Sequence, residues 1–118
     1  MDTVENLGTT VLVTLKNIAK ENVLDKLSSL QKIVKLVATE NELDVKAEAG
    51  HQFEPTGASV TYILGSSHLL VHTWPEFKSM TIDVHMCNRD ALTSALAICG
   101  SLEKATGGKI ATQNVINH

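Results

Sequence analysis

Residues 58–87 read ASVTYILGSSHLLVHTWPEFKSMTIDVHMC, and this stretch predicts three consecutive strands. Residues 58–64 and 69–73 are mainly apolar runs joined by a turn at Gly65-Ser66. Residues 79–87 alternate between apolar and polar or weakly polar side chains, with Met80, Ile82, Val84 and Met86 on one side and Thr81, Asp83, His85 and Cys87 on the other. A sheet built from such strands has one buried face and one polar face.

The segments on either side add helices and further strands. Residues 9–15 (TTVLVTL) predict the first strand, residues 44–53 a weaker one that ends at the turn signal Glu54-Pro55-Thr56-Gly57, and residues 109–116 a last one. Helical spacing predicts an amphipathic helix over residues 20–38, with an apolar stripe at Val23, Leu27, Leu30, Val34 and Val37. A second helix starts after Asn88 or Asp90 as N-cap and stops at Gly107-Gly108, with a stripe at Leu92, Leu96, Cys99 and Leu102.

This order of elements predicts an α+β fold: a two-layer α/β sandwich with a mainly antiparallel sheet and the helices on one face. With 118 residues and no linker or low-complexity tract, we expect a single domain over residues 1–118. The net charge of −3 without a Lys/Arg run argues against a nucleic-acid partner. The chain has no 18-residue apolar stretch and no basic segment at residues 1–5, so we expect no membrane partner and a cytoplasmic location. Two cysteines are too few for a disulfide framework.

Several side chains could support chemistry, and each also has a plain structural interpretation. A serine at a turn with His72 five residues after Ser67 suggests nucleophilic activation, but the Gly-x-Ser-x-Gly elbow of serine hydrolases is missing. His68 and His72 on one strand would lie roughly 13 Å apart, too far to share a metal ion, so we expect no metal site. Taken singly, a histidine here is a half-buried residue bonded to backbone, Trp74 a core residue, and Cys99 an inert thiol on an apolar stripe.

The combination of motifs, however, resembles one family. His51-Gln52-Phe53-Glu54-Pro55, the run Ser-His-Leu-Leu-Val-His-Thr-Trp-Pro-Glu over residues 67–76, and Asp83-Val84 followed by Cys87 are similar to the prokaryotic S-adenosylmethionine decarboxylase proenzymes. The resemblance implies self-cleavage between Ser66 and Ser67: the Ser67 hydroxyl attacks the Ser66 carbonyl carbon, and residue 67 ends as a pyruvoyl group. It also implies that His72 is the base of this maturation and Ser59 a second processing residue.

In the mature enzyme, the resemblance implies a Schiff base between the pyruvoyl cofactor and S-adenosylmethionine, which draws off the electrons released with CO₂. Cys87 would return a proton to the carbon. Phe53 and Trp74 would sandwich the adenine, Glu76 would bind the ribose hydroxyls, and Leu69 would line the pocket. The product would supply aminopropyl groups for spermidine biosynthesis, and the site would lie at the interface of a homodimer of cleaved protomers.

Two features leave alternatives open. The family usually has glutamate before the nucleophilic serine, where this chain has Ser66. That departure is the support for an uncleaved, non-catalytic regulatory paralogue. A pyruvoyl-dependent ornithine or arginine decarboxylase is a further alternative, which Trp74 and Glu76 argue against because a substrate without adenosine does not need them. In addition, Ser67 and His72 would point to opposite faces of a regular strand, so we expect Ser67 in the turn or beside a bulge.

Overall fold

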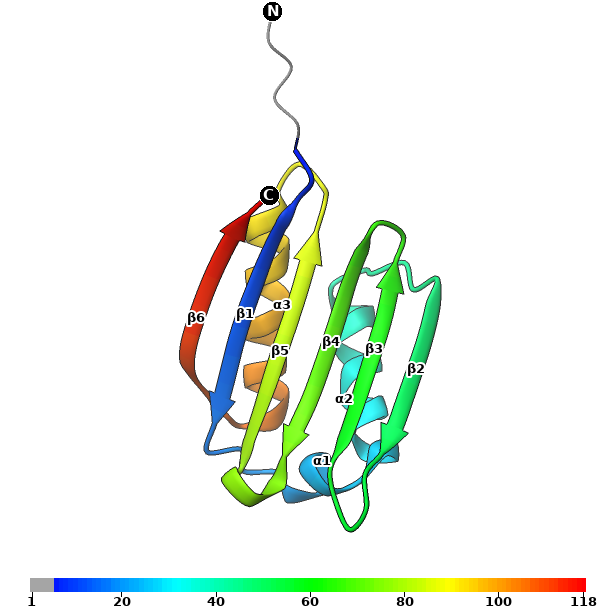
Figure 1. Cartoon of the computed structure of the whole chain (residues 1–118), viewed down its shortest axis with the longest axis vertical. Coiled ribbons are helices and arrows are strands. Elements are labelled where there is room, and N and C mark those ends of the chain that lie inside the picture. Colours follow the sequence, from blue (N-terminus) through cyan, green and yellow to red (C-terminus); the bar gives the residue numbers. More distant parts are fainter. Residues whose placement is uncertain (1–5) are drawn as a thin grey trace, which may run out of the picture.

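The computed structural model describes residues 6–118. The prediction made from residues 1–5, that they carry no targeting signal, falls outside the described residues. Its elements follow one another from the N-terminus as β1 (Thr9–Lys16), α1 (Glu21–Asp25), α2 (Leu27–Glu40), β2 (Ala47–Gln52), β3 (Ala58–Leu64), β4 (Ser67–Trp74), the 3₁₀ turn η1 (Pro75–Phe77), β5 (Ser79–Met86), α3 (Ala91–Thr106) and β6 (Lys109–Asn117) (Figure 1). In the part of the chain that is described, no helix is both long and apolar enough to cross a bilayer.

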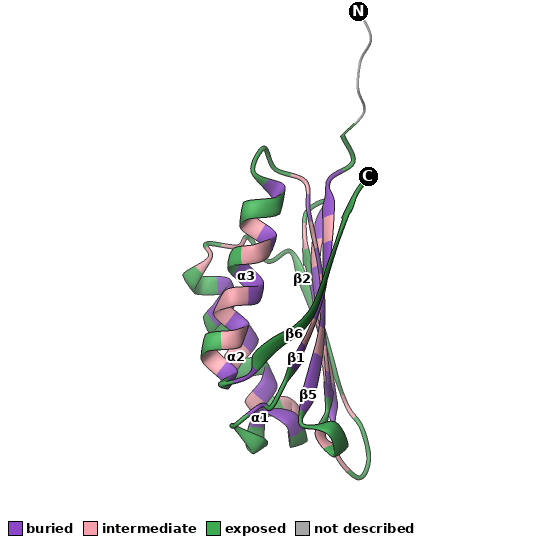
Figure 2. Ribbon diagram, turned by 90° about the vertical axis from the view of Figure 1, so that its left-hand side faces the viewer, coloured by how far each residue is buried: buried purple, intermediate pink, exposed green. Residues whose placement is uncertain are grey.

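The six strands form one sheet in the order β2-β3-β4-β5-β1-β6, and every neighbouring pair is antiparallel. The helices cover a single face of this sheet, which confirms the predicted two-layer α+β fold (Figure 2). The core lies between the layers, where alternate side chains of the central strands meet the apolar sides of α2 and α3. Its fully buried members include Val11, Leu69, Val71 and Val84 from the sheet and Leu30, Val34, Ile98 and Leu102 from the helices.

The other side of the sheet, called the open face below, carries no helix (Figure 2). Its side chains are the alternate, outward-pointing residues of the strands, and they are partly or fully exposed. Leu12 on β1 is 36% exposed, Ile63 on β3 is 50% exposed and Trp74 at the end of β4 is 44% exposed. An antiparallel sheet commonly leaves one face in water. This open face mixes apolar, hydroxyl and imidazole groups, and it carries four of the predicted site residues, namely Ser59, His72, Trp74 and Cys87.

Three details differ from the prediction. The helix predicted over residues 20–38 is two helices, because Lys26 adopts an extended conformation (φ −122°, ψ 129°) between α1 and α2. The weak strand begins at Ala47, three residues later than predicted. On α3, Leu92 is 42% exposed, and the buried stripe consists instead of Ala91, Ala95, Ile98, Cys99, Leu102 and Thr106. The predicted and observed stripes share Cys99 and Leu102. The helix was therefore predicted at the right place in the sequence, but the side that it buries is rotated about the helix axis relative to the predicted side.

Candidate functional site

The predicted cleavage site lies at one end of the sheet, in the tight turn between β3 and β4. Gly65 has a φ of +76°, a conformation that side chains other than glycine rarely adopt, and Ser66 follows it in the turn. Ser67 is already the first residue of β4 and pairs with Leu64. The pairing of β3 with β4 continues without a shift from Leu64–Ser67 to Ser59–His72. The expectation that Ser67 sits in the turn or beside a bulge was therefore wrong.

Cys87 lies directly against this turn. Its backbone N–H donates a hydrogen bond to Ser67 Oγ at 3.2 Å, and its thiol lies 3.3 Å from the carbonyl oxygen of Ser66. The same sulfur lies 3.2 Å from His85 Nε2, on the polar side of β5 where the alternation predicted it. The structure thus joins the two serines and the thiol into one group, called the cleavage group below. A thiol can donate a hydrogen bond to the carbonyl that self-cleavage has to attack.

Five other predicted residues meet at the opposite end of the sheet. A cavity of about 360 Å³ is lined by Phe53, Ser59, His72, Trp74 and Glu76, together with Thr56, Gly57 and Thr73. A volume of this size falls within the range of small-molecule sites. The aromatic side chains that flank it are open to a ligand, since Phe53 is 45% exposed and Trp74 is 44% exposed. This cavity is called the aromatic pocket below.

Strand pairing builds the polar wall of the aromatic pocket. Ser59 on β3 is the direct partner of His72 on β4, and Ser59 Oγ is hydrogen-bonded to His72 Nδ1. The Trp74 indole N–H donates to Thr81 Oγ1 at 3.2 Å, which ties the ring to β5. Glu76 lies in η1, where the chain turns from β4 to β5. His72 and Ser59 are consequently an associated pair, as their predicted common role in processing requires.

The cleavage group and the aromatic pocket do not meet within one chain. Ser67 and His72 are five positions apart on β4, which corresponds to roughly 17 Å at about 3.4 Å per residue. Their side chains also point to opposite faces, since Ser67 is buried on the helix side and His72 is half-buried on the open face. Figure 1 shows the same separation, with the β3–β4 turn at one end of the sheet and η1 at the other.

The remaining predicted residues have simpler surroundings. Leu69 is fully buried between the sheet and the helices and is not among the residues that line the aromatic pocket of the single chain, so its pocket-lining role stays a prediction. Cys99 is fully buried on α3, and burial raises the pKa of its thiol to about 12. A thiol that stays protonated and unexposed is unreactive, in agreement with the inert role predicted for it.

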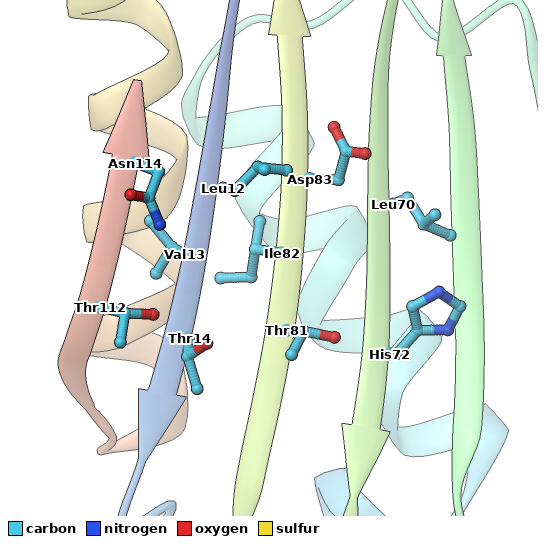
Figure 3. A pocket seen from close by; sticks show the side chains of 10 residues that line it. All are labelled: Leu12, Val13, Thr14, Leu70, His72, Thr81, Ile82, Asp83, Thr112 and Asn114. Carbon is cyan, nitrogen blue, oxygen red and sulfur yellow. The ribbon is translucent and has the colours of Figure 1, made fainter. Parts of the chain in front are cut away.

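A second hollow lies between the two ends, in the middle of the open face (Figure 3). It has a volume of about 310 Å³ and extends across β6, β1, β5 and β4. Leu12, Leu70 and His72 line it, and Asp83 supplies its only carboxylate. The floor is therefore largely apolar and hydroxyl in character, and it connects the region of the aromatic pocket with the strands that lead to Cys87.

Sequence reasoning missed two sets of residues beside these sites. Gln52 lies next to Phe53, and its side chain accepts from the Leu27 N–H at 2.7 Å and donates to the carbonyl oxygens of Asp25, Phe53 and Gly57. Thr10 and His118 join His85 beside Cys87 through hydrogen bonds. Gln52 was part of a recognised motif, but its sequence position carries no sign of the helix ends it contacts. Thr10 and His118 are 108 positions apart, and only strand pairing unites them.

Comparisons with known proteins identify a family. A family model described as S-adenosylmethionine decarboxylase matches residues 9–114. An S-adenosylmethionine decarboxylase proenzyme of Thermodesulfovibrio yellowstonii is 36% identical over 81 residues, which are 69% of this chain and 59% of that protein. One of Thermosipho melanesiensis is 30% identical over 86 residues, 73% of this chain and 65% of that protein. The chain thus aligns with less than two thirds of the length of these relatives.

Among solved structures, the adenosylmethionine decarboxylase from Aquifex aeolicus has a similar fold. The TM-score is 0.81 at 23% sequence identity, and the superposition covers 98% of this chain and 91% of that chain. At this level of identity the likeness concerns the fold, and it extends over nearly all of the residues described above.

Proposed function

The chain belongs to the S-adenosylmethionine decarboxylase family, and on that premise we propose that it is a proenzyme that cuts itself between Ser66 and Ser67 and then decarboxylates S-adenosylmethionine. The product would serve as the aminopropyl donor for spermidine biosynthesis. The observation that carries the proposal is the cleavage group, in which the Cys87 thiol lies 3.3 Å from the carbonyl oxygen of Ser66. The tight turn thus brings together the Ser67 hydroxyl, the Ser66 carbonyl that it would attack, and the Cys87 thiol as a hydrogen-bond donor to that carbonyl.

The cleavage can be written from these groups. The Ser67 Oγ attacks the Ser66 carbonyl carbon, the peptide C–N bond breaks, and an ester joins the two residues. The thiol hydrogen bond stabilises negative charge on the carbonyl oxygen during the attack. Removal of the Ser67 α-proton then expels the Ser66 carboxylate, and hydrolysis releases ammonia and leaves a pyruvoyl group on residue 67. The residue before Ser67 takes part only through its backbone carbonyl. Serine at position 66, where the family usually has glutamate, therefore does not block this chemistry.

We propose that the base for the α-proton comes from a second chain. His72, paired with Ser59, has the right chemistry because an imidazole titrates near neutral pH. Its distance of five residues along β4 from Ser67 rules it out as the base within one chain. We therefore propose a homodimer in which His72 of one protomer acts on Ser67 of its partner.

The open face offers the surface for this dimer. The Cys87 and His85 side chains at one end and His72 and Trp74 at the other lie on this same face. A two-fold axis between two facing sheets, at right angles to the strands, reverses the strand direction of the second copy. It would bring the cleavage group of each protomer over the aromatic pocket of the other. The apolar hollow around Leu12 and Leu70 would then be covered at the centre (Figure 3).

The aromatic pocket fits the substrate proposed from the family. Phe53 and Trp74 present aromatic faces that can stack on a purine, and stacking between rings adds about 0.5–1.5 kcal/mol beyond area burial. The Glu76 carboxylate beside them can accept hydrogen bonds from ribose hydroxyls. A positively charged sulfonium is also favoured near this carboxylate and the chain's net charge of −3. A substrate without an adenosine would leave these three side chains unused.

The residues of the cleavage group also fit the mature role. A pyruvoyl group at residue 67 would accept the electron pair released when CO₂ leaves. Cys87 would lie beside it and hold the proton that returns to the substrate carbon. His72 and Ser59 of the partner would line the same site, and the neighbouring aromatic pocket would fix the nucleoside away from water.

Intact-mass measurement under denaturing conditions tests the first step. Purified wild-type protein should separate into residues 1–66 and a second chain blocked at its N-terminus, whereas Ser67→Ala should remain one chain. Processed protein given S-adenosylmethionine with a labelled carboxyl group should then release labelled CO₂. A wild-type chain that stays intact would favour the regulatory paralogue. Release from ornithine or arginine instead would favour the amino-acid decarboxylase.

Mixing two inactive variants tests the shared site. Ser67→Ala supplies an intact His72, and His72→Ala supplies an intact Ser67, so a mixed dimer contains one complete cleavage site only if the base acts across the interface. We expect the His72→Ala chain to be cut after mixing and to stay intact when incubated alone. Cleavage of His72→Ala by itself, or no cleavage after subunit exchange has been verified, would overturn the assignment of His72 as a base in trans.

A further inference from the structure

A continuous chain of hydrogen-bonding groups leads from the protein surface to Cys87. His118 Nε2 lies 2.8 Å from Thr10 Oγ1, the same hydroxyl oxygen lies 2.8 Å from His85 Nδ1, and His85 Nε2 lies 3.2 Å from Cys87 Sγ. His118 is exposed, whereas His85 is half-buried. The chain therefore links water with the thiol through two imidazoles and one hydroxyl.

Backbone pairing fixes this arrangement. Thr10 on β1 is the direct partner of His85 on β5, and on its other side it pairs with Ile116 on β6. The His118 N–H donates to the Gly8 carbonyl at 2.9 Å, which holds the end of β6 against the start of β1. Thr10 and His85 thus come from neighbouring strands, and His118 directly follows the third strand, β6, where its backbone hydrogen bond to Gly8 holds it.

One assignment of protons satisfies every contact in the same direction. The thiol S–H donates to the Ser66 carbonyl oxygen, His85 Nε2–H donates to the sulfur, the Thr10 O–H donates to His85 Nδ1, and His118 Nε2–H donates to Thr10 Oγ1. The Cys87 thiol donates to the turn, and each of the other three groups donates one hydrogen bond in the direction of Cys87. A hydroxyl can accept and donate at once, so Thr10 can pass a proton between the two rings.

The proposed reaction needs such a supply. Replacing a carboxylate with a C–H bond releases CO₂ and consumes one proton in every turnover, and that proton finally comes from water. After Cys87 has given its proton to the substrate carbon, the sulfur is a thiolate and must be protonated again before the next turnover. A donor already hydrogen-bonded to the sulfur performs this step without waiting for water to enter the site.

We propose that His85 reprotonates Cys87, and that Thr10 and His118 carry the replacement proton from water to His85; this inference rests on the proposed decarboxylase function. The His85 Nε2–H bond breaks as the S–H bond forms, Nδ1 takes the Thr10 hydroxyl proton, Thr10 Oγ1 takes the His118 Nε2 proton, and His118 takes one from water. The net change is one proton moved from water to the thiolate. Exchange of the half-buried ring with water returns His85 to its starting tautomer between turnovers.

The surroundings of His85 fit proton transfer better than metal binding. His68 stacks on the ring with centroids 5.6 Å apart, and its Nε2 lies 3.0 Å from a carboxylate oxygen of Asp83. His118 meets the ring edge-on with centroids 5.2 Å apart. Within residues 6–118, no group of three or more His, Cys, Asp or Glu side chains is arranged to hold a metal ion. The titratable neighbours of His85 are thus His68, Asp83, Cys87 and His118, each held in a defined contact.

A thiol-labelling experiment tests the contact without any turnover. In the unprocessed Ser67→Ala background, Cys87 is alkylated with iodoacetamide across pH 5.5–9, with and without the additional change His85→Gln. Because His85 Nε2 lies 3.2 Å from the sulfur, His85→Gln should change the alkylation rate at pH 7 several-fold and alter the pH profile. Buried Cys99 serves as an internal control for unfolding. Identical profiles for the two proteins would overturn the proposal.

Kinetics of the processed enzyme test the relay. His85→Gln and Thr10→Val should cut themselves as the wild type does and keep its KM for S-adenosylmethionine, but their kcat should fall about 10-fold or more, in keeping with positioned proton transfer. Added imidazole should restore part of the kcat of His85→Gln. Thr93→Val, at an exposed threonine of α3 on the helix side of the sheet and away from the open face, is the matched control and should behave as wild type. Wild-type kcat and pH profile in His85→Gln would overturn the relay and leave the decarboxylase function standing, whereas an inactive wild type would overturn the proposed function itself.

Discussion

The two cysteines of the chain lie in opposite environments, and this contrast allows a test at the scale of single residues. Cys87 contacts the Ser66 carbonyl, Ser67 and His85, whereas Cys99 is fully buried in α3. Cys87→Ala removes the proposed proton donor and the hydrogen bond to the attacked carbonyl. We expect slower but measurable self-cleavage and a 10²–10⁴-fold loss of turnover in the chains that have been cut. Intact mass and labelled CO₂ release measure the two effects separately.

Cys99→Ala is the matched control for that substitution. It removes a buried sulfur and leaves a small cavity, so the free energy of unfolding should fall by roughly 1–3 kcal/mol while self-cleavage and turnover per folded molecule stay unchanged. Chemical denaturation gives the first quantity. Normal turnover in correctly cut Cys87→Ala would exclude its thiol as the proton donor.

Burial of Cys99 also predicts how stability changes with pH. Because burial raises the pKa of this thiol from 9.0 to about 12, the unfolded chain releases the proton first as the pH rises. The stability present below pH 9 is therefore lost progressively between pH 9 and pH 12, by at most about 1.4 kcal/mol per pH unit. Urea denaturation of wild type and Cys99→Val at pH 8 and pH 10.5 should show a smaller alkaline loss in the variant. Equal losses would show that the thiol does not contribute.

At the scale of elements, Gln52 connects the edge strand β2 with the gap between α1 and α2. Its side chain accepts from the first N–H of α2 and donates to carbonyl oxygens on both sides of the aromatic pocket loop. Gln52→Ala leaves these backbone groups without their partner, so we expect a stability loss of about 1–3 kcal/mol and a raised KM for S-adenosylmethionine, with self-cleavage least affected. Gln52→Glu keeps the acceptor for Leu27 and should recover part of the stability. An unchanged KM in a folded Gln52→Ala would separate this residue from the pocket.

The same region shows where prediction from sequence stopped. Strand alternation and helical spacing were sufficient for the layers, the sheet and the positions of most elements, because those depend on local periodicity, whereas the exact buried side of α3 depends on its packing against the sheet. The break at Lys26 was not predictable in this way, since no proline or glycine marks it and the side chain that caps α2 comes from Gln52, 25 positions later. Leu69 was assigned to the pocket by resemblance, whereas the alternation of β4 points its side chain toward the helices, into the core. Local patterns located the elements, and long-range contacts determined their ends.

At the scale of the whole molecule, the proposed dimer needs the open face to complete its site. Leu12 lies in its central hollow and is 36% exposed in the single chain, so Leu12→Lys should cost little in a monomer. In the proposed dimer it would place a charge in a covered interface. We expect a folded monomer that stays uncut, as measured by light scattering and intact mass. Leu36→Lys, an equally large change at an exposed position of α2, is the control and should cut normally. A Leu12→Lys monomer that still cleaves would contradict the shared site.

The position of Ser67 and His72 at opposite ends of β4 has a kinetic consequence. In the proposed mechanism a newly made chain carries both the nucleophile and the base and cannot bring them together, so its activation would begin only when it encounters another copy. At low concentration the rate of maturation would then rise with the square of the amount of precursor, and at high concentration, where every chain is dimeric, it would rise only in proportion to that amount. Freshly synthesised chains would remain dormant until enough of them had accumulated, and the abundance of the protein would itself set the moment at which the activity begins.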